Sequence, residues 1–201
     1  EGLIGSSPVA LTEYNGTLFF VANDGLHGHE LWTSDGTTEG TILLKDLKPG
    51  AYGDYITNMV TYNGMLYLGH GSKLWKSDGT ASGTTPVKTI ARIDFLALIN
   101  GKILFSAYNS DYGEELWQSD GTTGGTTLLK DINPAGSSKV SNITNVNGEA
   151  YFSANDGDGI ALWKSDGTEA GTVKIKQIAT PYSSSAPGVS PDTERMYFSA
   201  R

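Results

Sequence analysis

The sequence contains no cysteine and only three histidines among its 201 residues. The absence of thiols excludes zinc–thiolate sites, cysteine nucleophiles and disulfide frameworks. Basic residues are also scarce, with 14 Lys and Arg against 22 Asp and Glu. A formal net charge of −8 repels phosphate backbones and anionic membrane surfaces, so we expect no nucleic-acid partner.

Long apolar runs are absent as well. No stretch reaches the roughly 18–20 apolar residues that a membrane-spanning helix requires, so we expect no insertion into a membrane. The first residues begin at Glu1 without a methionine, and they lack the basic and then apolar layout of a signal peptide. We therefore interpret the chain as processed or as a piece of a longer one. A chain of this length buries roughly 70% of its unfolded surface and needs no disulfide or metal to hold a core.

What the sequence does contain is an internal repeat. The segment LWxSDGT occurs four times, at residues 31–37, 74–80, 116–122 and 162–168. It contains all four tryptophans, which are separated by 43, 42 and 46 residues: Trp32, Trp75, Trp117 and Trp163. Periods of this length predict a repeat architecture. We expect a single domain over 1–201, with repeats at 1–47, 48–90, 91–132 and 133–178 and a half repeat at 179–201.

Each repeat is predicted to contain two β-hairpins. Asn-Gly pairs at 15–16, 63–64, 100–101 and 147–148 lie between β-rich runs, and both residue types tolerate the positive φ of a tight hairpin. The Asp-Gly of each SDGT segment lies between two further strands. Its aspartates are expected to cap the hairpin loop by accepting hydrogen bonds from backbone N–H groups: Asp35, Asp78, Asp120 and Asp166. No stretch has helical periodicity, so the sequence predicts an all-β protein.

The strands carry apolar residues at consecutive positions, as at 18–20 and 103–105, which indicates that both faces of each sheet are buried. Four-stranded sheets with neighbours on both faces, in repeats of roughly 40–50 residues, predict a β-propeller whose sheets are its blades. Alternating the two hairpin types gives roughly 18 strands, or about four and a half blades. Three interpretations stay open: a five-bladed ring with one thin blade, a fragment of a longer array, and a subunit whose unpaired edges are completed by a neighbour.

The repeated motifs resemble a known family. The segments HELWTSDGTTEGT, KLWKSDGTASGT, EELWQSDGTTGGT and ALWKSDGTEAGT are similar to the ELWxxDGT repeats of exported and surface-associated bacterial proteins. The resemblance implies propeller-like blades, an extracellular or cell-surface location and little chemistry. The Asp-Gly hairpin also resembles the Asp box of other propellers, in which the aspartate is structural. Lys73 and Ala161 replace the motif's Glu in the second and fourth copies, so no role that needs a carboxylate in every blade is implied.

Residues shared by all repeats are interpreted as scaffold. The four tryptophans are expected in the core of the blades, with stacking on sugars as the alternative. The four loop aspartates are expected to be turn caps, with cation binding as the alternative. A lysine closes a strand in every repeat and is expected to be solvated or hydrogen-bonded scaffold: Lys45, Lys88, Lys130 and Lys176.

Candidate site residues lie in the loops that differ between repeats, because binding residues concentrate on loops over a rigid scaffold. In the first repeat, His27 and His29 alternate with glycine and are candidates for ligand or metal binding. In the third repeat, the candidate ligand-binding residue is Tyr112. In the fourth, three residues begin like a calcium-binding EF-hand loop but lack its terminal Glu, so calcium is a candidate cofactor and a plain Gly-rich turn the alternative: Asn155, Asp156 and Asp158.

The connections between repeats are rich in Pro, Gly and Ser and supply a second group of candidates. Tyr52, Asp54 and Tyr55 combine aromatic surface with hydrogen-bonding groups, which suits a carbohydrate. The alternative is that these tyrosines shield the hydrophobic core.

The sequence favours a binding protein over an enzyme. It contains no GxSxG, no phosphate-binding loop and no HExxH, so we expect no catalytic activity. The leading hypothesis is an extracellular binding or adhesion module whose propeller loops recognise glycan or a surface protein. The alternative is a structural subunit that self-assembles into surface arrays or filaments as a homo-oligomer through its half-blade edges. A polysaccharide-acting enzyme is the third hypothesis, and the carboxylates outside the repeated positions that could form its pair are Asp54, Asp94, Asp111 and Glu114.

Overall fold

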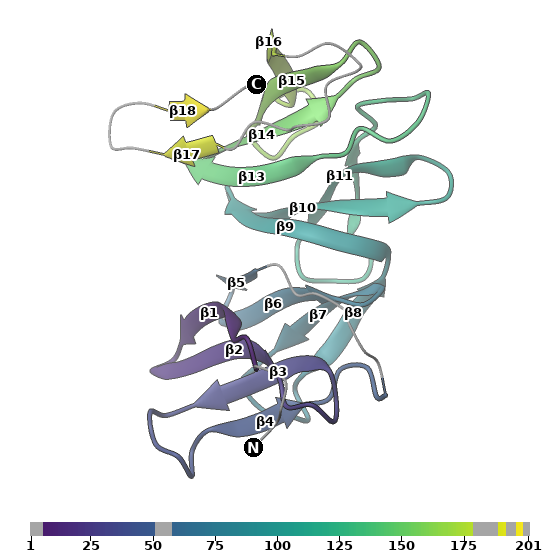
Figure 1. The fold of residues 1–201 in the computed structure, drawn as a ribbon. Coiled ribbons are helices and arrows are strands. Elements are labelled where there is room, and N and C mark those ends of the chain that lie inside the picture. The colour runs from purple at the N-terminus through teal and green to yellow at the C-terminus, as the bar shows by residue number, and fades with distance from the viewer. Residues whose placement is uncertain (1–5, 51–57, 179–188, 192–195, 199–201) are drawn as a thin grey trace. The chain divides into compact units, whose positions relative to one another are not determined.

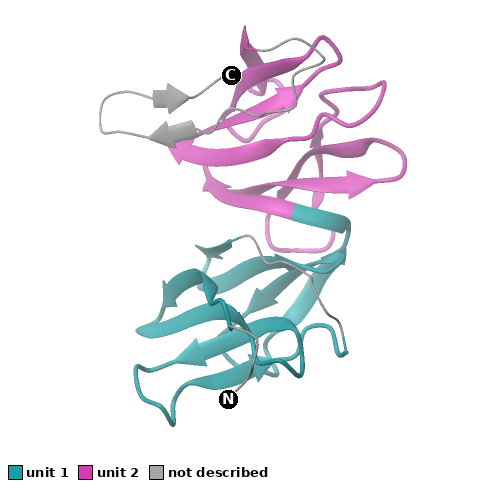
Figure 2. Ribbon diagram, viewed as in Figure 1, with its two compact units in different colours: residues 1–93 teal, residues 94–201 magenta. Residues whose placement is uncertain are grey.

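The structure is a computed structural model of the chain, and it describes residues 6–50 and 58–178 together with two short strands at 189–191 and 196–198 (Figure 1). All regular secondary structure in these residues is β-strand, and none of it is a helix that could cross a membrane. The chain divides into two compact units, residues 1–93 and 94–201 (Figure 2). Each unit is built from two four-stranded antiparallel sheets.

The first unit contains the sheets of the first two repeats, each a meander with its strands in chain order. The first sheet consists of β1 (Val9–Tyr14), β2 (Thr17–Asn23), β3 (His29–Ser34) and β4 (Ile42–Lys45). The second sheet consists of β5 (Met59–Tyr62), β6 (Met65–His70), β7 (Lys73–Ser77) and β8 (Thr85–Thr89).

The second unit repeats this arrangement, and β9 begins just before the unit boundary. Its first sheet consists of β9 (Ala91–Ile99), β10 (Lys102–Asn109), β11 (Gly113–Ser119) and β12 (Thr127–Lys130). The next consists of β13 (Ser141–Val146), β14 (Glu149–Asn155), β15 (Ile160–Ser165) and β16 (Val173–Gln177). Finally, β17 (Val189–Pro191) and β18 (Met196–Phe198) pair with each other. The prediction of an all-β chain with four-stranded sheets is confirmed.

The Asn-Gly pairs form the hairpin turns between the first two strands of each sheet. Asn15 and Gly16 have φ angles of 52° and 77°, and the other three pairs share this conformation. Two successive positive φ angles define the turn whose twist matches that of the flanking strands. The local sequence therefore fixes the first hairpin of every repeat.

The SDGT segments form the second hairpin loop, and the four copies share one set of hydrogen bonds. In the first copy, Asp35 Oδ1 accepts from Thr37 N at 2.9 Å and from Thr37 Oγ1 at 2.7 Å. The hydroxyl and N–H of Thr37 lower the pKa of Asp35. Gly40 is required because a Cβ there would overlap the Asp35 carboxylate. These are the carboxylate-to-amide contacts that the Asp-Gly pair predicts.

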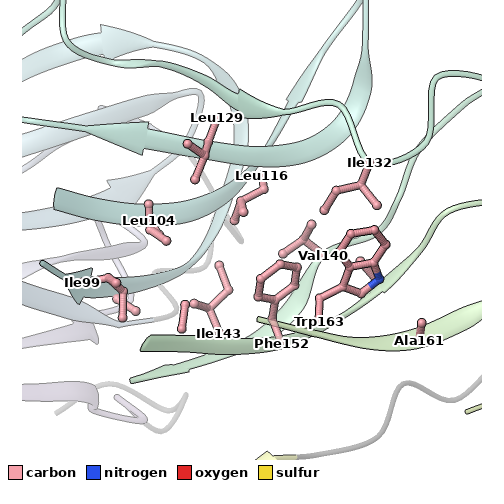
Figure 3. Close-up of a cluster of buried hydrophobic side chains, with 13 residues drawn as sticks. Ile99, Leu104, Leu116, Leu129, Ile132, Val140, Ile143, Phe152, Ala161 and Trp163 are labelled. Atoms are coloured by element: carbon pink, nitrogen blue, oxygen red, sulfur yellow. The ribbon is translucent and has the colours of Figure 1, made fainter. Parts of the chain in front are cut away.

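Each unit has its own hydrophobic core, formed between its two sheets. In the second unit, Leu116 and Leu129 of one sheet pack with Phe152 and Trp163 of the next (Figure 3). In the first unit, the tryptophan of the second sheet packs in the same way against the first. Adjacent residues of β10, such as Leu104 and Phe105, are both fully buried, so the prediction that both faces of a sheet are covered is confirmed for the third sheet.

Candidate functional site

The end of β10 and the loop that follows it carry two exposed aromatic side chains. Tyr108 is 44% exposed and Tyr112 is 43% exposed, more than any other aromatic side chain for which exposure is described. The corresponding loops of the other repeats contain no tyrosine. Polar groups share the loop, with Asn109, Ser110 and Asp111 between the two tyrosines. Tyr112 was a candidate from the sequence, and Tyr108 was missed, although its presence in a single repeat was a usable signal.

Local hydrogen bonds give this loop a defined shape. Asn109 pairs with Gly113 across the hairpin, and Asn109 Oδ1 accepts a hydrogen bond from Asp111 N at 2.7 Å. Gly113 has a φ of 77°, and a Cβ at this position would lie 2.7 Å from Ser137 Oγ. Glycine is therefore needed both for the turn and for the close approach of the neighbouring connection.

The connection between β12 and β13 makes hydrogen bonds to the first residues of β11, directly after the loop. Glu114 N donates to Ser137 Oγ at 3.0 Å, and Ser138 N donates to Glu114 O at 2.9 Å. The buried carboxylate of Glu115 accepts from Ile132 N and Ser138 N, each at 2.8 Å. The start of β11, directly after Tyr112, is thus held to the 132–138 connection by these hydrogen bonds.

The chemistry of this surface suits a polyhydroxylated ligand. Aromatic rings offer an apolar face to the C–H groups of a sugar, and the neighbouring carboxylate, amide and hydroxyl groups can hydrogen-bond its hydroxyls. No basic side chain lies in the segment 108–114, so nothing in it favours an anionic ligand.

In the first repeat, the predicted histidine pair is divided between a loop and a strand. His27 lies in the β2–β3 loop, where Nδ1 contacts Asp24 Oδ2 at 2.6 Å, and His29 opens β3. Burial opposes ionisation of Asp24, but the backbone N–H and imidazole of His27 hold its pKa at about 2. The same hydrogen bond raises the pKa of His27. Within the described ranges, no three His, Asp or Glu side chains are grouped to hold a metal ion.

In the fourth repeat, the candidate calcium residues make contacts within their own hairpin. Asn155 Oδ1 accepts from Gly157 N at 2.8 Å, and Asp156 Oδ1 accepts from Asp158 N at 3.2 Å. Asp156 Oδ2 pairs with Lys174 Nζ at 2.5 Å across the sheet. Burial disfavours the Asp156 carboxylate, but Lys174 lowers its pKa overall. These contacts are those of a Gly-rich turn closed by an ion pair.

The remaining candidates from the sequence, Tyr52, Asp54 and Tyr55, lie outside the described residues.

The first sheet also carries a hollow on one face. It has a volume of about 230 Å³ and is lined mainly by apolar groups, including Phe20, Ala22 and Trp32. The Trp32 ring stacks on Phe20 with a centroid distance of 6.4 Å, and Trp32 Nε1 donates to Ala22 O at 3.1 Å. Trp32 is half-buried, whereas the other three tryptophans are each 6% exposed. The tryptophan that all four repeats share is therefore more exposed in the first repeat than in the others.

Comparison with known proteins gives matches at the level of fold. No protein-family profile and no curated protein matches the chain. The extracellular domain of a one-component system from B. thetaiotaomicron matches 98% of this chain and 26% of its own chain, with a TM-score of 0.67 and 15% identity. A puromycin hydrolase matches 90% of this chain and 31% of its own, with a TM-score of 0.57 and 15% identity. A prolyl endopeptidase matches 84% and 26%, with a TM-score of 0.56 and 12% identity.

These three matches concern the fold alone, because the identities are low. The chain spans between 26% and 31% of the length of the solved structures.

Proposed function

We propose that the chain is a non-enzymatic extracellular binding module of the ELWxxDGT repeat type, which recognises a glycan through the β10–β11 loop. The observation that carries this proposal is the exposure of Tyr108, at the end of β10, and of Tyr112, in the loop that follows, in a single repeat. In a repeat protein, function is expected where one copy departs from the others. Under this proposal the four sheets are blades of a β-propeller, and β17 and β18 begin a fifth.

An extracellular location is supported by the fold of the neighbour from B. thetaiotaomicron, which is itself an extracellular domain. The absence of cysteine is compatible with export, because a chain of this length needs no disulfide to hold its core. Adhesion to a surface carrying many copies of a glycan would suit a shallow site, since weak contacts gain from multivalency.

The site is an exposed loop, so single-site affinity is expected to be low, with a Kd of roughly 0.1–10 mM. A glycan array followed by titration calorimetry tests this directly. Substitution of Tyr112 or Tyr108 by Ala is expected to weaken binding about tenfold, because each removes one aromatic face. Leu26→Ala is the matched control, since Leu26 is an exposed residue on the corresponding loop of the first repeat and should leave binding unchanged. The proposal fails if no glycan binds at millimolar concentration, or if all three variants bind like the native chain.

The third hypothesis, hydrolysis of a polysaccharide, has its own measurement. Asp111 lies beside Tyr112 and would be one member of a carboxylate pair. We expect no release of reducing sugar from any glycan that binds. Release that disappears in Asp111→Asn while binding persists would assign an enzymatic function to the same loop.

A further inference from the structure

One face of the first sheet carries large apolar side chains at positions whose equivalents are buried in other repeats. Phe20, Trp32 and Leu43 lie opposite one another on neighbouring strands and form what we term the head face. The hollow of about 230 Å³ opens beside Phe20 and Trp32. All three side chains of the head face are only partly buried.

The equivalent faces of two other repeats show what covers such a surface. In the second sheet, Leu68 and Trp75 occupy the positions of Phe20 and Trp32, and they pack in the core formed with the first sheet. In the fourth sheet, Phe152 and Trp163 pack with Leu116 and Leu129 of the third sheet (Figure 3). Within each unit, the tryptophan face of one repeat is therefore covered by the sheet that precedes it.

A lysine accompanies this packing in both units. Lys45, at the end of β4, donates from Nζ to Ala81 O in the next repeat's SDGT loop at 2.8 Å. Lys130, at the end of β12, donates to Thr172 O at 2.9 Å and to Glu169 O at 3.3 Å in the fourth repeat. The contact between successive repeats thus has two parts, an apolar face and a lysine that binds loop carbonyls.

The fourth sheet carries the other half of this contact, and no described residue covers it as the fourth sheet covers the third. Ile175 on β16 is 46% exposed, whereas its equivalents Val87 and Leu129 are each 6% exposed. The next residue, Lys176, holds the position of Lys45 and Lys130, and its ammonium makes no hydrogen bond to another described residue, although its backbone pairs with β15. We term Ile175 and Lys176 the tail face. The strands that follow, β17 and β18, form a two-stranded sheet and not a full repeat.

We propose that the head face binds the tail face of a second copy of this chain. Trp32 and Phe20 of one copy pack on Ile175 of the other, and Lys176 donates to carbonyls of the SDGT loop near Thr38. The occupant is a second copy because one chain presents both halves of a contact that it already makes twice within itself. Such a head-to-tail contact is heterologous and extends into an open chain of subunits unless its rotation closes a ring. This inference goes beyond glycan recognition, which uses a different loop.

Chemical cross-linking tests the contact, because the native chain has no cysteine. Thr38 and Ala81 are each the third residue after the loop aspartate, so Thr38→Cys and Lys176→Cys place one thiol on each face. Two singly substituted proteins are mixed and treated with a short bis-maleimide. We expect a covalent dimer in the mixture and a ladder of species from the double variant.

A matched pair within the chain calibrates this experiment. Lys45→Cys with Ala81→Cys joins positions that are in contact in the first unit, and it should cross-link within one chain at the mass of the monomer. The proposal is overturned if the mixture gives no dimer while this control reacts. It is also overturned if Thr38→Cys/Lys176→Cys cross-links only within one chain, because the chain would then close on itself.

Association in solution gives an independent measurement. Light scattering over a concentration series should show the mass growing above that of the monomer, and Trp32→Ala should weaken association about tenfold or more. Lys176→Glu changes an exposed residue of the tail face, so weaker association of that variant cannot come from misfolding of the head face. Tyr108→Ala should leave association unchanged, which separates this contact from the glycan site. A strict monomer at all concentrations overturns the proposal and leaves glycan binding untouched.

Discussion

The first and third repeats differ from the second and fourth in how the chain leaves the last strand of each sheet. In the second and fourth repeats, the amide groups of Ile90 and Ile178 donate to backbone carbonyls, each at 2.9 Å. In the first and third, the equivalent amides of Leu47 and Ile132 donate to the carboxylates of Glu30 and Glu115. A buried glutamate therefore replaces a backbone acceptor in the repeats that carry the full ELW motif.

The two glutamates are not equivalent. Glu115 is fully buried, and each of its oxygens accepts a backbone N–H, from Ile132 and Ser138. Glu30 is 1% exposed, and its Oε2 accepts from Leu47 N at 2.5 Å, but Oε1 accepts no hydrogen bond from the described residues. Burial raises the pKa of Glu30 to about 7 against the stabilising N–H groups of Leu47 and Lys48, and the nearby Asp46 raises it further.

The same residue type at the same motif position therefore contributes differently to stability in the two repeats. At Glu115 the carboxylate accepts two backbone N–H groups of the 132–138 connection, which contacts the start of β11 after Tyr112. At Glu30 the same side chain accepts from Leu47 N at 2.5 Å through Oε2, leaves Oε1 without a hydrogen bond from the described residues, and carries an unfavourable burial cost. A buried polar group stabilises a fold only as far as its hydrogen bonds are complete.

The largest effect is expected from Glu115→Ala. The substitution leaves the buried amide of Ile132 without its acceptor, at roughly 1–3 kcal/mol, and it removes one of the two acceptors of Ser138 N, which still donates to Glu114 O. We expect the free energy of unfolding to fall by about 2–4 kcal/mol in urea titrations. Glycan affinity at Tyr112 should also decrease, because the connection that supports the loop is released. A loss below about 1 kcal/mol would mean that water replaces the carboxylate and that Glu115 does not stabilise the fold more than Glu30 does.

The second effect is the dependence of stability on pH through Glu30. Its pKa is about 7 in the folded chain and near 4.5 otherwise, so between these values the folded state keeps a proton that the unfolded state has lost. The contribution of Glu30 to stability is therefore fully present below pH 4.5 and is lost as the pH rises through 7, by about 3 kcal/mol.

Urea titrations between pH 5 and 8 measure this slope. Glu30→Gln should remove most of it. The raised pKa of His27 acts in the same direction, since protonated His27 is favoured by Asp24 in the folded state. His27→Gln is therefore the control, and a slope that survives Glu30→Gln but disappears in His27→Gln would assign the effect to the histidine.

The sequence predicts the local turns of each repeat but not the role of these glutamates. The Asn-Gly turns and the Asp35-type caps are set by contacts within a few residues, so the sequence predicts them. The loss of Glu at Lys73 and Ala161 was visible in the sequence as well. Its meaning was not, because the acceptor role depends on amides 17 residues further along the chain.

The candidate site follows the same division. Tyr112 could be selected from its variable loop, but the exposure of Tyr108 depends on how β10 ends. The ion pair between Asp156 and Lys174 joins residues 18 positions apart across the sheet, which no local pattern in the β14–β15 loop reveals. The half-buried state of Trp32 could not be predicted either, because it depends on which side chains cover a residue that all four repeats share.

A smaller effect is expected when each glutamate is changed to glutamine. In Glu115→Gln, the new NH₂ group must point toward one of the two backbone donors, so the substitution should cost about 1–3 kcal/mol. In Glu30→Gln, the NH₂ group can take the unpaired position while the side-chain carbonyl stays on Leu47 N, so the cost should be less than about 1 kcal/mol at pH 6. Paired urea titrations measure the difference, and equal losses would show that the two carboxylates are equivalent after all.

The smallest effect is expected when the missing glutamate is restored by Lys73→Glu. The N–H that such a carboxylate serves in the first repeat belongs here to Ile90, and it already donates to Ser72 O. The substitution also removes the Lys73 ammonium from the Trp75 ring, 5.4 Å from its centroid. We expect a loss of about 0.5–1 kcal/mol and no gain. A stabilisation in thermal or urea unfolding would mean that the motif's Glu is favourable in any repeat, whereas the expected loss would show that its value depends on an amide left without a backbone acceptor.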